Sequence, residues 1–115
     1  MNTLIGEVNQ LHAHICQALA DPTRILILYA LYEHPRNVTE IAADCEIPQP
    51  TVSRHLKALR DRGLVVSTRK GNAVMYSLRD SRVIEALNIM RALLADLLSQ
   101  NARLADEVDS SKPES

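Results

Sequence analysis

Hydrogen-bonding and cationic side chains recur at helical spacing between residues 51 and 61. On a helix that turns by about 100° per residue, one face would collect Thr51, Arg54, Lys57 and Asp61, with Ser53 at its flank. Arginine can read a guanine edge through two hydrogen bonds, whereas hydroxyl and ammonium groups suit phosphate oxygens. The residue types on this face therefore indicate binding to a nucleic acid, with Arg54 suited to reading bases.

The positive charge of the chain is concentrated around this face. The 115 residues carry a formal net charge of -1, yet residues 51–82 contain eight basic and two acidic residues, which leaves +6 there and -7 elsewhere. A positive block on a slightly acidic chain is typical of a dedicated polyanion-binding surface. The basic residues of the block are Arg54, Lys57, Arg60, Arg62, Arg69, Lys70, Arg79 and Arg82.

The cationic face needs a helix to present it. Pro50 suits the first turn of such a helix, and Gly63 suits the position just after its end. Its opposite face carries an apolar stripe of Val52, Leu56 and Leu59, which predicts that this face is buried.

Two β-capable runs follow the predicted helix. They cover Leu64–Arg69 and Ala73–Leu78, and residues 70–72 join them. Such a pattern predicts a hairpin, and Arg69 and Lys70 make its tip basic.

Three helices are predicted ahead of the cationic one, because apolar residues recur at helical spacing and capping signals precede two of them. They are Leu4–Leu19, then Thr23–Glu33 after the N-cap Asp21 and Pro22, then a short helix capped by Asn37 with Glu40 three residues on. A turn at Ile47–Gln49 leads into the cationic helix. The order predicts a mainly α fold with a small β-hairpin, a winged helix-turn-helix, whose cationic helix would enter a major groove of double-stranded DNA.

A last helix is predicted from Asp80 to about Val108. Its length of ~40 Å, at 1.5 Å per residue, exceeds the width of so small a domain, so we expect part of it to project. Apolar residues follow a 4,3,4,3 spacing that is typical of helices packed against a partner, and we expect a homodimer through the terminal helices. The seam comprises Val83, Leu87, Met90, Leu94, Leu97, Leu104 and Val108, with Asn101 in the same row. Residues 1–108 would form one domain, and residues 109–115 a disordered tail.

Composition argues against several other classes of protein. Three tyrosines are the only aromatic residues, too few for binding single strands by stacking. We find no phosphate-binding glycine loop and no paired nucleophile and base, so no enzyme and no resident cofactor are predicted. Two cysteines without a signal peptide give no disulfide framework, and no apolar run approaches the roughly 18 residues of a membrane span. We expect a cytoplasmic protein with no membrane partner.

Several stretches, taken in order, resemble the ArsR/SmtB family of bacterial metal-responsive repressors over roughly residues 11–98. They are Ala18–Arg24, Gln49–Leu59, Gly63–Leu64 and Gly71–Leu78. The resemblance implies a dimeric transcriptional repressor that an inducer releases from operator DNA, with contacts from Gln49, Ser53 and Arg54. Glutamine adds a side chain suited to adenine edges. Pro48 departs from the family, which usually has a serine there that can cap the helix.

The metal sites of the family are absent from their usual positions. Where arsenic-type members carry three cysteines, the matching residues are Asn37, Thr39 and Ala42. Zinc-type members pair two acids with two histidines in the last helix. Here the acids remain as Asp80 and Asp96, whereas Arg82 and Leu93 occupy the histidine positions. Two carboxylates without imidazoles make a poor zinc site, so no metal site is predicted.

The remaining candidates for sensing are Cys16, Cys45, His12 and His14. His12 and Cys16 lie four residues apart and could share a soft metal on one helix face. The resemblance favours packing roles for the thiols, because relatives have bulky apolar residues at these positions and buried cysteine behaves as a small hydrophobe. Thiol-based sensing and a histidine-assisted metal both stay open. His55, at the margin of the cationic helix's core, favours a structural or phosphate role.

A winged-helix module that contacts other proteins is the alternative function. Such a module would keep the fold without needing a cationic recognition face. It would bind duplex DNA weakly and without sequence preference, whereas a repressor should discriminate its site by at least ~10³.

Overall fold

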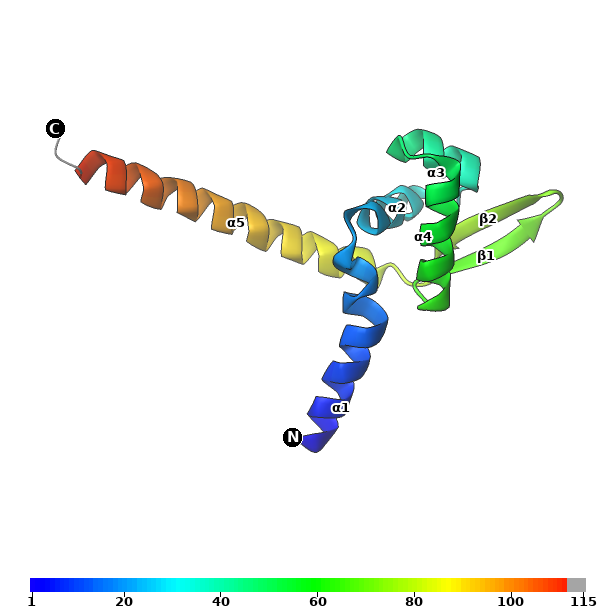
Figure 1. Cartoon of the computed structure of the whole chain (residues 1–115), viewed down its shortest axis with the longest axis horizontal. Coiled ribbons are helices and arrows are strands. Elements are labelled where there is room, and N and C mark those ends of the chain that lie inside the picture. The colour runs from blue at the N-terminus through cyan, green and yellow to red at the C-terminus, as the bar shows by residue number, and fades with distance from the viewer. Residues whose placement is uncertain (112–115) are drawn as a thin grey trace. The chain divides into compact units, whose positions relative to one another are not determined.

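The computed structural model describes the backbone of residues 1–111 and the side chains of residues 1–103. The chain forms two compact units, Met1–Ile84 and Glu85–Ser115. Helices α2 (Pro22–Glu33), α3 (Val38–Cys45) and α4 (Gln49–Asp61) of the first unit lie against one another, with a hairpin of β1 (Val65–Lys70) and β2 (Ala73–Leu78) beside them (Figure 1). This order of elements is the predicted winged helix-turn-helix.

The N-terminal segment is not the single continuous helix that the sequence predicts over Leu4–Leu19. Helix α1 covers Asn2–Leu11, a π-helical turn η1 covers His12–Cys16, and a 3₁₀ turn η2 covers Ala18–Ala20. The widened turn is marked by the bond from the Gln17 backbone N–H to the carbonyl of His12, five residues back. Apolar periodicity reports which residues share a face, and it carries no signal for a one-turn change of helix type.

Capping residues set the starts of α2 and α3 as predicted. The Asp21 carboxylate accepts hydrogen bonds from the backbone N–H groups of Thr23 and Arg24, and Pro22 begins α2. The Asn37 side chain accepts from the Glu40 N–H, and the Glu40 carboxylate accepts from the Asn37 N–H, which completes a capping box at α3.

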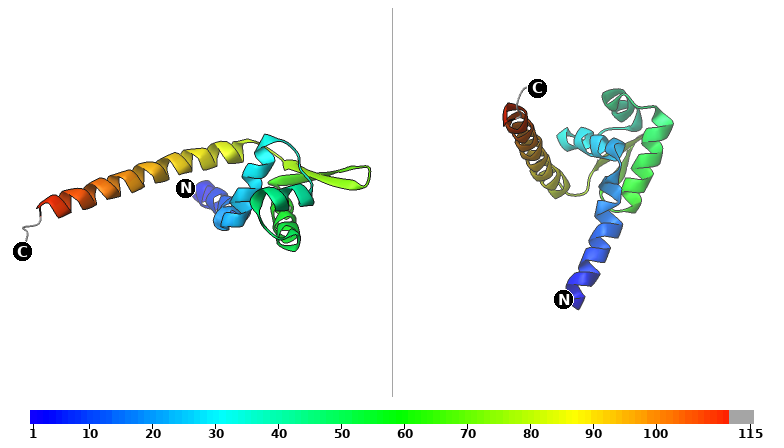
Figure 2. Two further views of the ribbon diagram at one scale, coloured as in Figure 1. Left: turned by 90° about the horizontal axis from the view of Figure 1, so that it is seen from above. Right: turned by 60° about the vertical axis from the view of Figure 1, so that its left-hand side comes forward.

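The connection between α4 and the hairpin depends on one glycine. Gly63 has φ +78°, and its N–H bonds the carbonyl of Arg60 while the Leu64 N–H bonds that of Leu59. This pair of bonds is a Schellman cap, which requires the left-handed conformation that glycine adopts without strain. The strands then pair antiparallel from Val65↔Leu78 to Lys70↔Ala73, one residue further along in β1 than predicted. Figure 2 shows the hairpin reaching out beyond the helices of its unit.

The core of the first unit is aliphatic. It joins α2, α3 and α4 to the base of the hairpin, and the predicted stripe of Val52, Leu56 and Leu59 is fully buried. Half-buried side chains at Val38, Ala42 and Cys45 border it. Its other buried members are Ala18, Ile27, Leu28, Leu31, Ile41, Val65 and Ile84. Burial of the stripe fixes which face of α4 is left for solvent.

Helix α5 covers Arg82–Ser111. It begins two residues later than the predicted start at Asp80. It also continues past the predicted end at Val108 through residues 109–111, which were predicted to belong to the disordered tail. The rest of the predicted tail, residues 112–115, lies outside the described residues, as do the side chains of Leu104 and Val108. No helix in the described part of the chain is both long enough and apolar enough to span a membrane.

Candidate nucleic-acid interface

Helix α4 presents the predicted polar face to solvent. Ser53, Arg54 and Lys57 are exposed and Thr51 is half-buried, while the apolar stripe faces the core. Pro48 is the N-cap and makes no side-chain hydrogen bond to the helix, as its replacement of a serine predicts. The backbone N–H groups of Thr51 and Val52 both donate to the Pro48 carbonyl, so the first turn of α4 presents mainly side chains to solvent.

The N-terminus of α4 is tied to α3 by a side-chain bond. Gln49 is exposed and is the first residue of α4, and its Nε2 donates to Oγ1 of Thr39 at 3.3 Å. Glu46 ends α3 with φ +57°, which turns the chain sharply toward α4. The contact holds the Gln49 amide at the leading edge of the polar face.

The middle of α4 is tied to α2 through His55. Its side chain is 8% exposed, and its Nδ1 accepts a hydrogen bond from Nε of Arg24 at 3.2 Å. Burial alone would raise the pKa of Asp21, but hydrogen bonds from the N–H groups of Thr23 and Arg24, with the positive charge of Arg24, hold that pKa below its ordinary value. His55 therefore joins α4 to α2 as a buried side chain, which favours the structural role over a phosphate contact.

The end of α4 is tied to the N-terminal segment. Nη1 of Arg62 donates to the backbone carbonyl of Ala13, within η1, and lies 3.5 Å from Oε1 of Gln17. A π-helical turn redirects the carbonyls that an α-helix would pair internally, and the guanidinium takes up one of them. Sequence reasoning counted Arg62 only as part of the basic block, because nothing local signals a partner 49 residues away.

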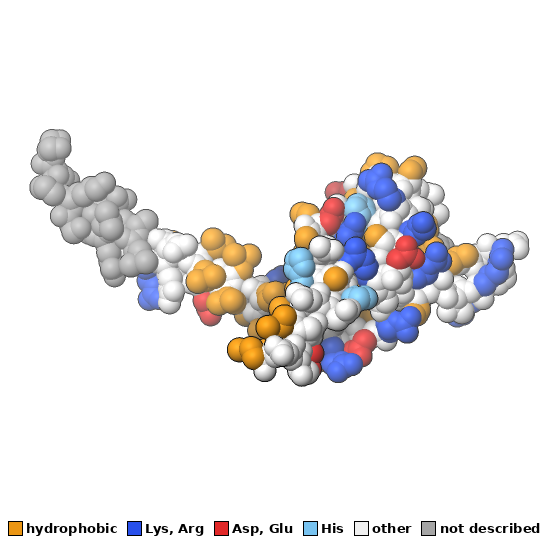
Figure 3. Space-filling model, turned by 60° about the horizontal axis from the view of Figure 1, so that its bottom comes forward, with side chains coloured by type: hydrophobic (Ala, Val, Ile, Leu, Met, Phe, Trp, Pro, Cys, Tyr) orange, Lys and Arg blue, Asp and Glu red, His pale blue; other side chains and the backbone are white. Residues whose placement is uncertain are grey.

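The hairpin carries the remaining predicted contact residues. Arg69 and Lys70 are exposed in the last two positions of β1, opposite Val74 and Ala73. Figure 3 shows Lys and Arg side chains recurring over the surface from the helices out to the hairpin. Of the basic block, Arg54, Lys57 and Arg60 are exposed on α4, and Arg69 and Lys70 are exposed on the hairpin.

The candidate sensing residues fall into two places. His12, His14 and Cys16 are exposed on η1, and His14 is bonded through Nδ1 to the carbonyl of Gln10 at 3.1 Å. The exposure of Cys16 contradicts a packing role for it within the described chain. Cys45 is half-buried, and burial, followed by the negative charge of Asp44, raises the pKa of its thiol.

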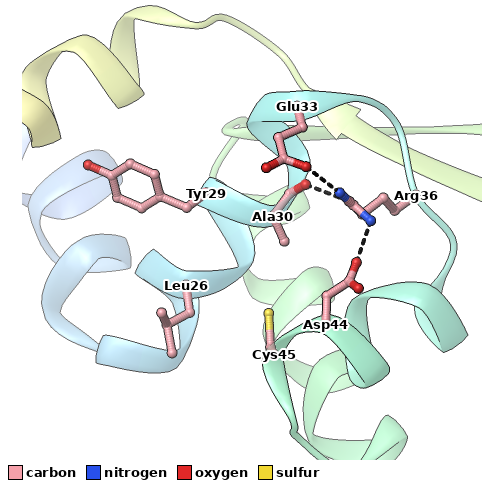
Figure 4. Close-up of a pocket in the computed structure, with 7 residues that line it drawn as sticks. All are labelled: Leu26, Tyr29, Ala30, Glu33, Arg36, Asp44 and Cys45. Carbon is pink, nitrogen blue, oxygen red and sulfur yellow. Dashed lines mark hydrogen bonds and ion pairs between the residues drawn. The ribbon is translucent and has the colours of Figure 1, made fainter.

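Cys45 lines a pocket of about 450 Å³ between α2 and α3. Figure 4 shows Leu26, Tyr29 and Ala30 on the α2 side and Asp44 and Cys45 on the α3 side. Glu33 and Arg36 complete its polar end. A thiol with a raised pKa is a weak nucleophile and a weak metal ligand, so the chemistry of Cys45 here is close to that of a small hydrophobe.

The zinc-type positions hold an ion pair. The Asp80 carboxylate accepts from the Arg82 guanidinium, with Nη2 to Oδ2 at 2.8 Å, and from the Arg82 backbone N–H. These bonds lower the pKa of Asp80 to about 2. Among the residues that the structure describes, no group of three or more His, Cys, Asp and Glu side chains is arranged to hold a metal ion.

Comparison with known proteins places the chain in a family. Residues 21–67, from the N-cap of α2 into β1, match the family described as "Bacterial regulatory protein, arsR family". The chain is 42% identical over 76 residues to the transcriptional regulator NmtR of Mycobacterium tuberculosis, across 66% of this chain and 63% of that relative. It is 42% identical over 84 residues to the transcriptional regulator CmtR of Mycobacterium bovis, across 72% and 71%.

Solved structures agree with this placement. The crystal structure of Rv0081 from M. tuberculosis superposes with a TM-score of 0.73 at 35% identity, covering 83% of this chain and 96% of that one. The solution structure of the homodimeric winged helix-turn-helix DNA-binding domain of Mb0332 from M. bovis also gives 0.73, at 26% identity, covering 87% and 92%. The fold and the relatives agree, and the chain belongs to the ArsR/SmtB family of helix-turn-helix transcriptional regulators.

Proposed function

We propose that this chain is a repressor that binds a twofold-symmetric operator as a homodimer and leaves it when an inducer binds. The observation that carries the proposal is the exposed polar face of α4, together with the exposed cations Arg69 and Lys70 at the hairpin tip. A helix of this kind reads the major groove, and the hairpin acts as a wing on the adjacent backbone or minor groove.

Contacts to DNA divide by chemistry. Gln49 and Arg54 are suited to the edges of adenine and guanine, because each offers two hydrogen bonds in one plane. Thr51, Ser53 and Lys57 on α4 are suited to phosphate oxygens. Arg69 and Lys70 at the wing tip are assigned to the phosphate backbone, because phosphate oxygens are the commonest partners of arginine and lysine in DNA complexes.

Two apolar helix faces supply the dimer interface. In α1 the face comprises Leu4, Ile5, Val8 and Leu11, and in α5 it includes Met90, Leu94 and Leu97, all of them exposed in the single chain. Figure 3 shows hydrophobic side chains at the surface of the described part of α5. Exposed apolar rows of this length indicate a protein partner, and the homodimeric state of the Mb0332 domain supports a second copy of the chain.

The inducer signal is assigned to Cys16 ahead of Cys45. Cys16 is exposed on η1, next to the carbonyl contact that holds the end of α4. Modification of this thiol, or metal binding shared with His12, would disturb a turn that is directly bonded to the recognition helix. Cys45 is half-buried, and the raised pKa of its thiol disfavours the thiolate that soft metals and oxidants require.

Two matched substitutions test the DNA face. Arg54→Ala should cost about 1 to 3 kcal/mol of binding free energy and relax sequence preference, because it removes a base contact. Lys70→Ala should weaken binding to all duplexes alike and reduce the slope of log K against log salt by about one. Fluorescence anisotropy with operator and scrambled duplexes measures both effects. If neither substitution changes binding, the proposed face is wrong. If the parent protein binds operator and scrambled duplexes equally and weakly, the protein-contact module is favoured.

A further inference from the structure

Arg36, in the loop between α2 and α3, is largely buried although it is charged. Its side chain is 13% exposed. Each of its three nitrogens donates: Nε to the Ala30 carbonyl at 2.7 Å, Nη2 to Oε2 of Glu33 at 2.7 Å, and Nη1 to Oδ2 of Asp44. Figure 4 shows the guanidinium between the end of α2 and the Asp44 side chain of α3. The side chain therefore fixes the loop to both helices.

The backbone of the same residue is paired with the wing. The Arg36 N–H donates to the Tyr76 carbonyl at 3.0 Å, and the Tyr76 N–H donates to the Arg36 carbonyl at 2.8 Å. This isolated antiparallel bridge makes Arg36 a one-residue third strand on the edge of β2. Tyr76 also pairs with Ser67 of β1, so the bridge reaches both strands of the hairpin.

Because the bridge lies near the base of the hairpin, a small rotation there moves the basic tip by a larger distance. Tyr76 lies four residues from Asn72 in the turn, which corresponds to ~13 Å of strand at ~3.3 Å per residue. A tilt of ~10° at the bridge would move the tip by ~2 Å, further than a phosphate contact of ~2.9 Å tolerates. The direction of the wing thus depends on how firmly Arg36 is held.

We propose that Arg36 is a positioning residue for DNA binding, which sets the direction of the wing relative to the helix-turn-helix. Its guanidinium fork locks the loop to α2 and α3, and its backbone transmits that position to Tyr76. Asp44 is the partner that matters most, because it joins the loop to the helix preceding α4, whereas Glu33 belongs to the same helix end as Ala30. The inference rests on the proposed function, because the proposed function assigns Arg69 and Lys70 to phosphate contacts.

A mutant cycle tests this coupling. In the parent protein, replacing Arg69 and Lys70 together by alanine should lower the slope of log K against log salt by about two. In an Arg36→Ala background, where the wing is no longer held in position, the same double replacement should lower the slope by less than about one. Asp44→Ala, which removes the bond to α3, should change the result in the same direction as Arg36→Ala, whereas Glu33→Ala should resemble the parent. Arg36→Lys should fall between the parent and Arg36→Ala because a single ammonium cannot reproduce the fork.

An amide measurement separates this proposal from the DNA-binding proposal. Hydrogen exchange of the Tyr76 N–H should quicken by about tenfold in Arg36→Ala, and in the same direction in Asp44→Ala, while core amides of α4 keep the parent rate. Equal slope changes in both backgrounds, or unchanged Tyr76 exchange in a folded variant, would overturn the role of Arg36. If the parent binds no DNA, the proposed function fails, and Tyr76 exchange still decides whether Arg36 holds the wing. If Arg36→Ala fails to fold, the Asp44→Ala and Arg36→Lys variants carry the test.

Discussion

The seam on α5 allows a quantitative prediction about the dimer. Leu94 and Leu97 are 53% and 47% exposed in the single chain and lie in the predicted apolar row. Full burial of a leucine side chain contributes about 1.5 to 3 kcal/mol, so covering the exposed half contributes about 0.8 to 1.5 kcal/mol. Two such residues on each of two protomers contribute about 3 to 6 kcal/mol, equivalent to roughly two to four powers of ten in the dimer dissociation constant.

Replacing both leucines by glutamate should remove this contribution and add charge repulsion across the seam. We expect the Leu94→Glu, Leu97→Glu variant to sediment as a monomer at micromolar concentration and to lose operator affinity, because one recognition helix reads only one half-site. Ile89→Glu is the matched control, since Ile89 is 71% exposed and lies outside the row; it should remain dimeric. A double variant that stays dimeric with the parent's dissociation constant, or a monomer with full operator affinity, would refute the reasoning.

Three further predictions follow from the site. Iodoacetamide should label Cys16 before Cys45 at neutral pH, and labelling of Cys45 should rise with pH because its pKa is raised; equal rates measured by mass spectrometry would contradict the assignment. Because the folded pKa of Asp21 is lowered, its ionisation stabilises the fold above the unfolded pKa, near 3.8, and this stabilisation is lost as pH falls through the folded value. Urea unfolding should show the parent losing stability relative to Asp21→Asn between about pH 5 and pH 2, and parallel curves would count against it. Arg24→Ala should lower the free energy of unfolding by about 1 to 3 kcal/mol, because it leaves the buried His55 acceptor without its donor. The same substitution should cost much less in a His55→Phe background. An equal loss in both backgrounds would show that the Arg24–His55 bond is not responsible.

Local signals account for the parts of the fold that the sequence predicted well. Asp21, Asn37 and Gly63 act within a few residues of themselves, so their types and spacing are enough to place helix ends. The stripe on α4 depends only on helical periodicity, and it identified the exposed face correctly. The hairpin was predicted within one residue because its turn and its β-capable runs are contiguous.

Contacts between distant residues account for what the sequence did not show. Arg62 meets Ala13, Arg24 meets His55, and Arg36 pairs its backbone with Tyr76. From sequence alone, an arginine is predicted to be an exposed charge. Whether its guanidinium instead points inward and bonds carbonyls or carboxylates depends on how the helices pack. The two thiols differ in the same way, because Cys16 lies in an N-terminal segment whose residues 1–17 are all exposed, whereas Cys45 packs against α2.

The central claim is that the exposed face of α4 reads a specific DNA sequence. The most direct measurement is the affinity of the parent protein for a duplex selected from random sequence, compared with a scrambled duplex of equal length, at one fixed salt concentration near 0.15 M. The account predicts a specificity ratio of at least ~10³ that falls when Arg54 is replaced by alanine. A ratio near one would contradict it.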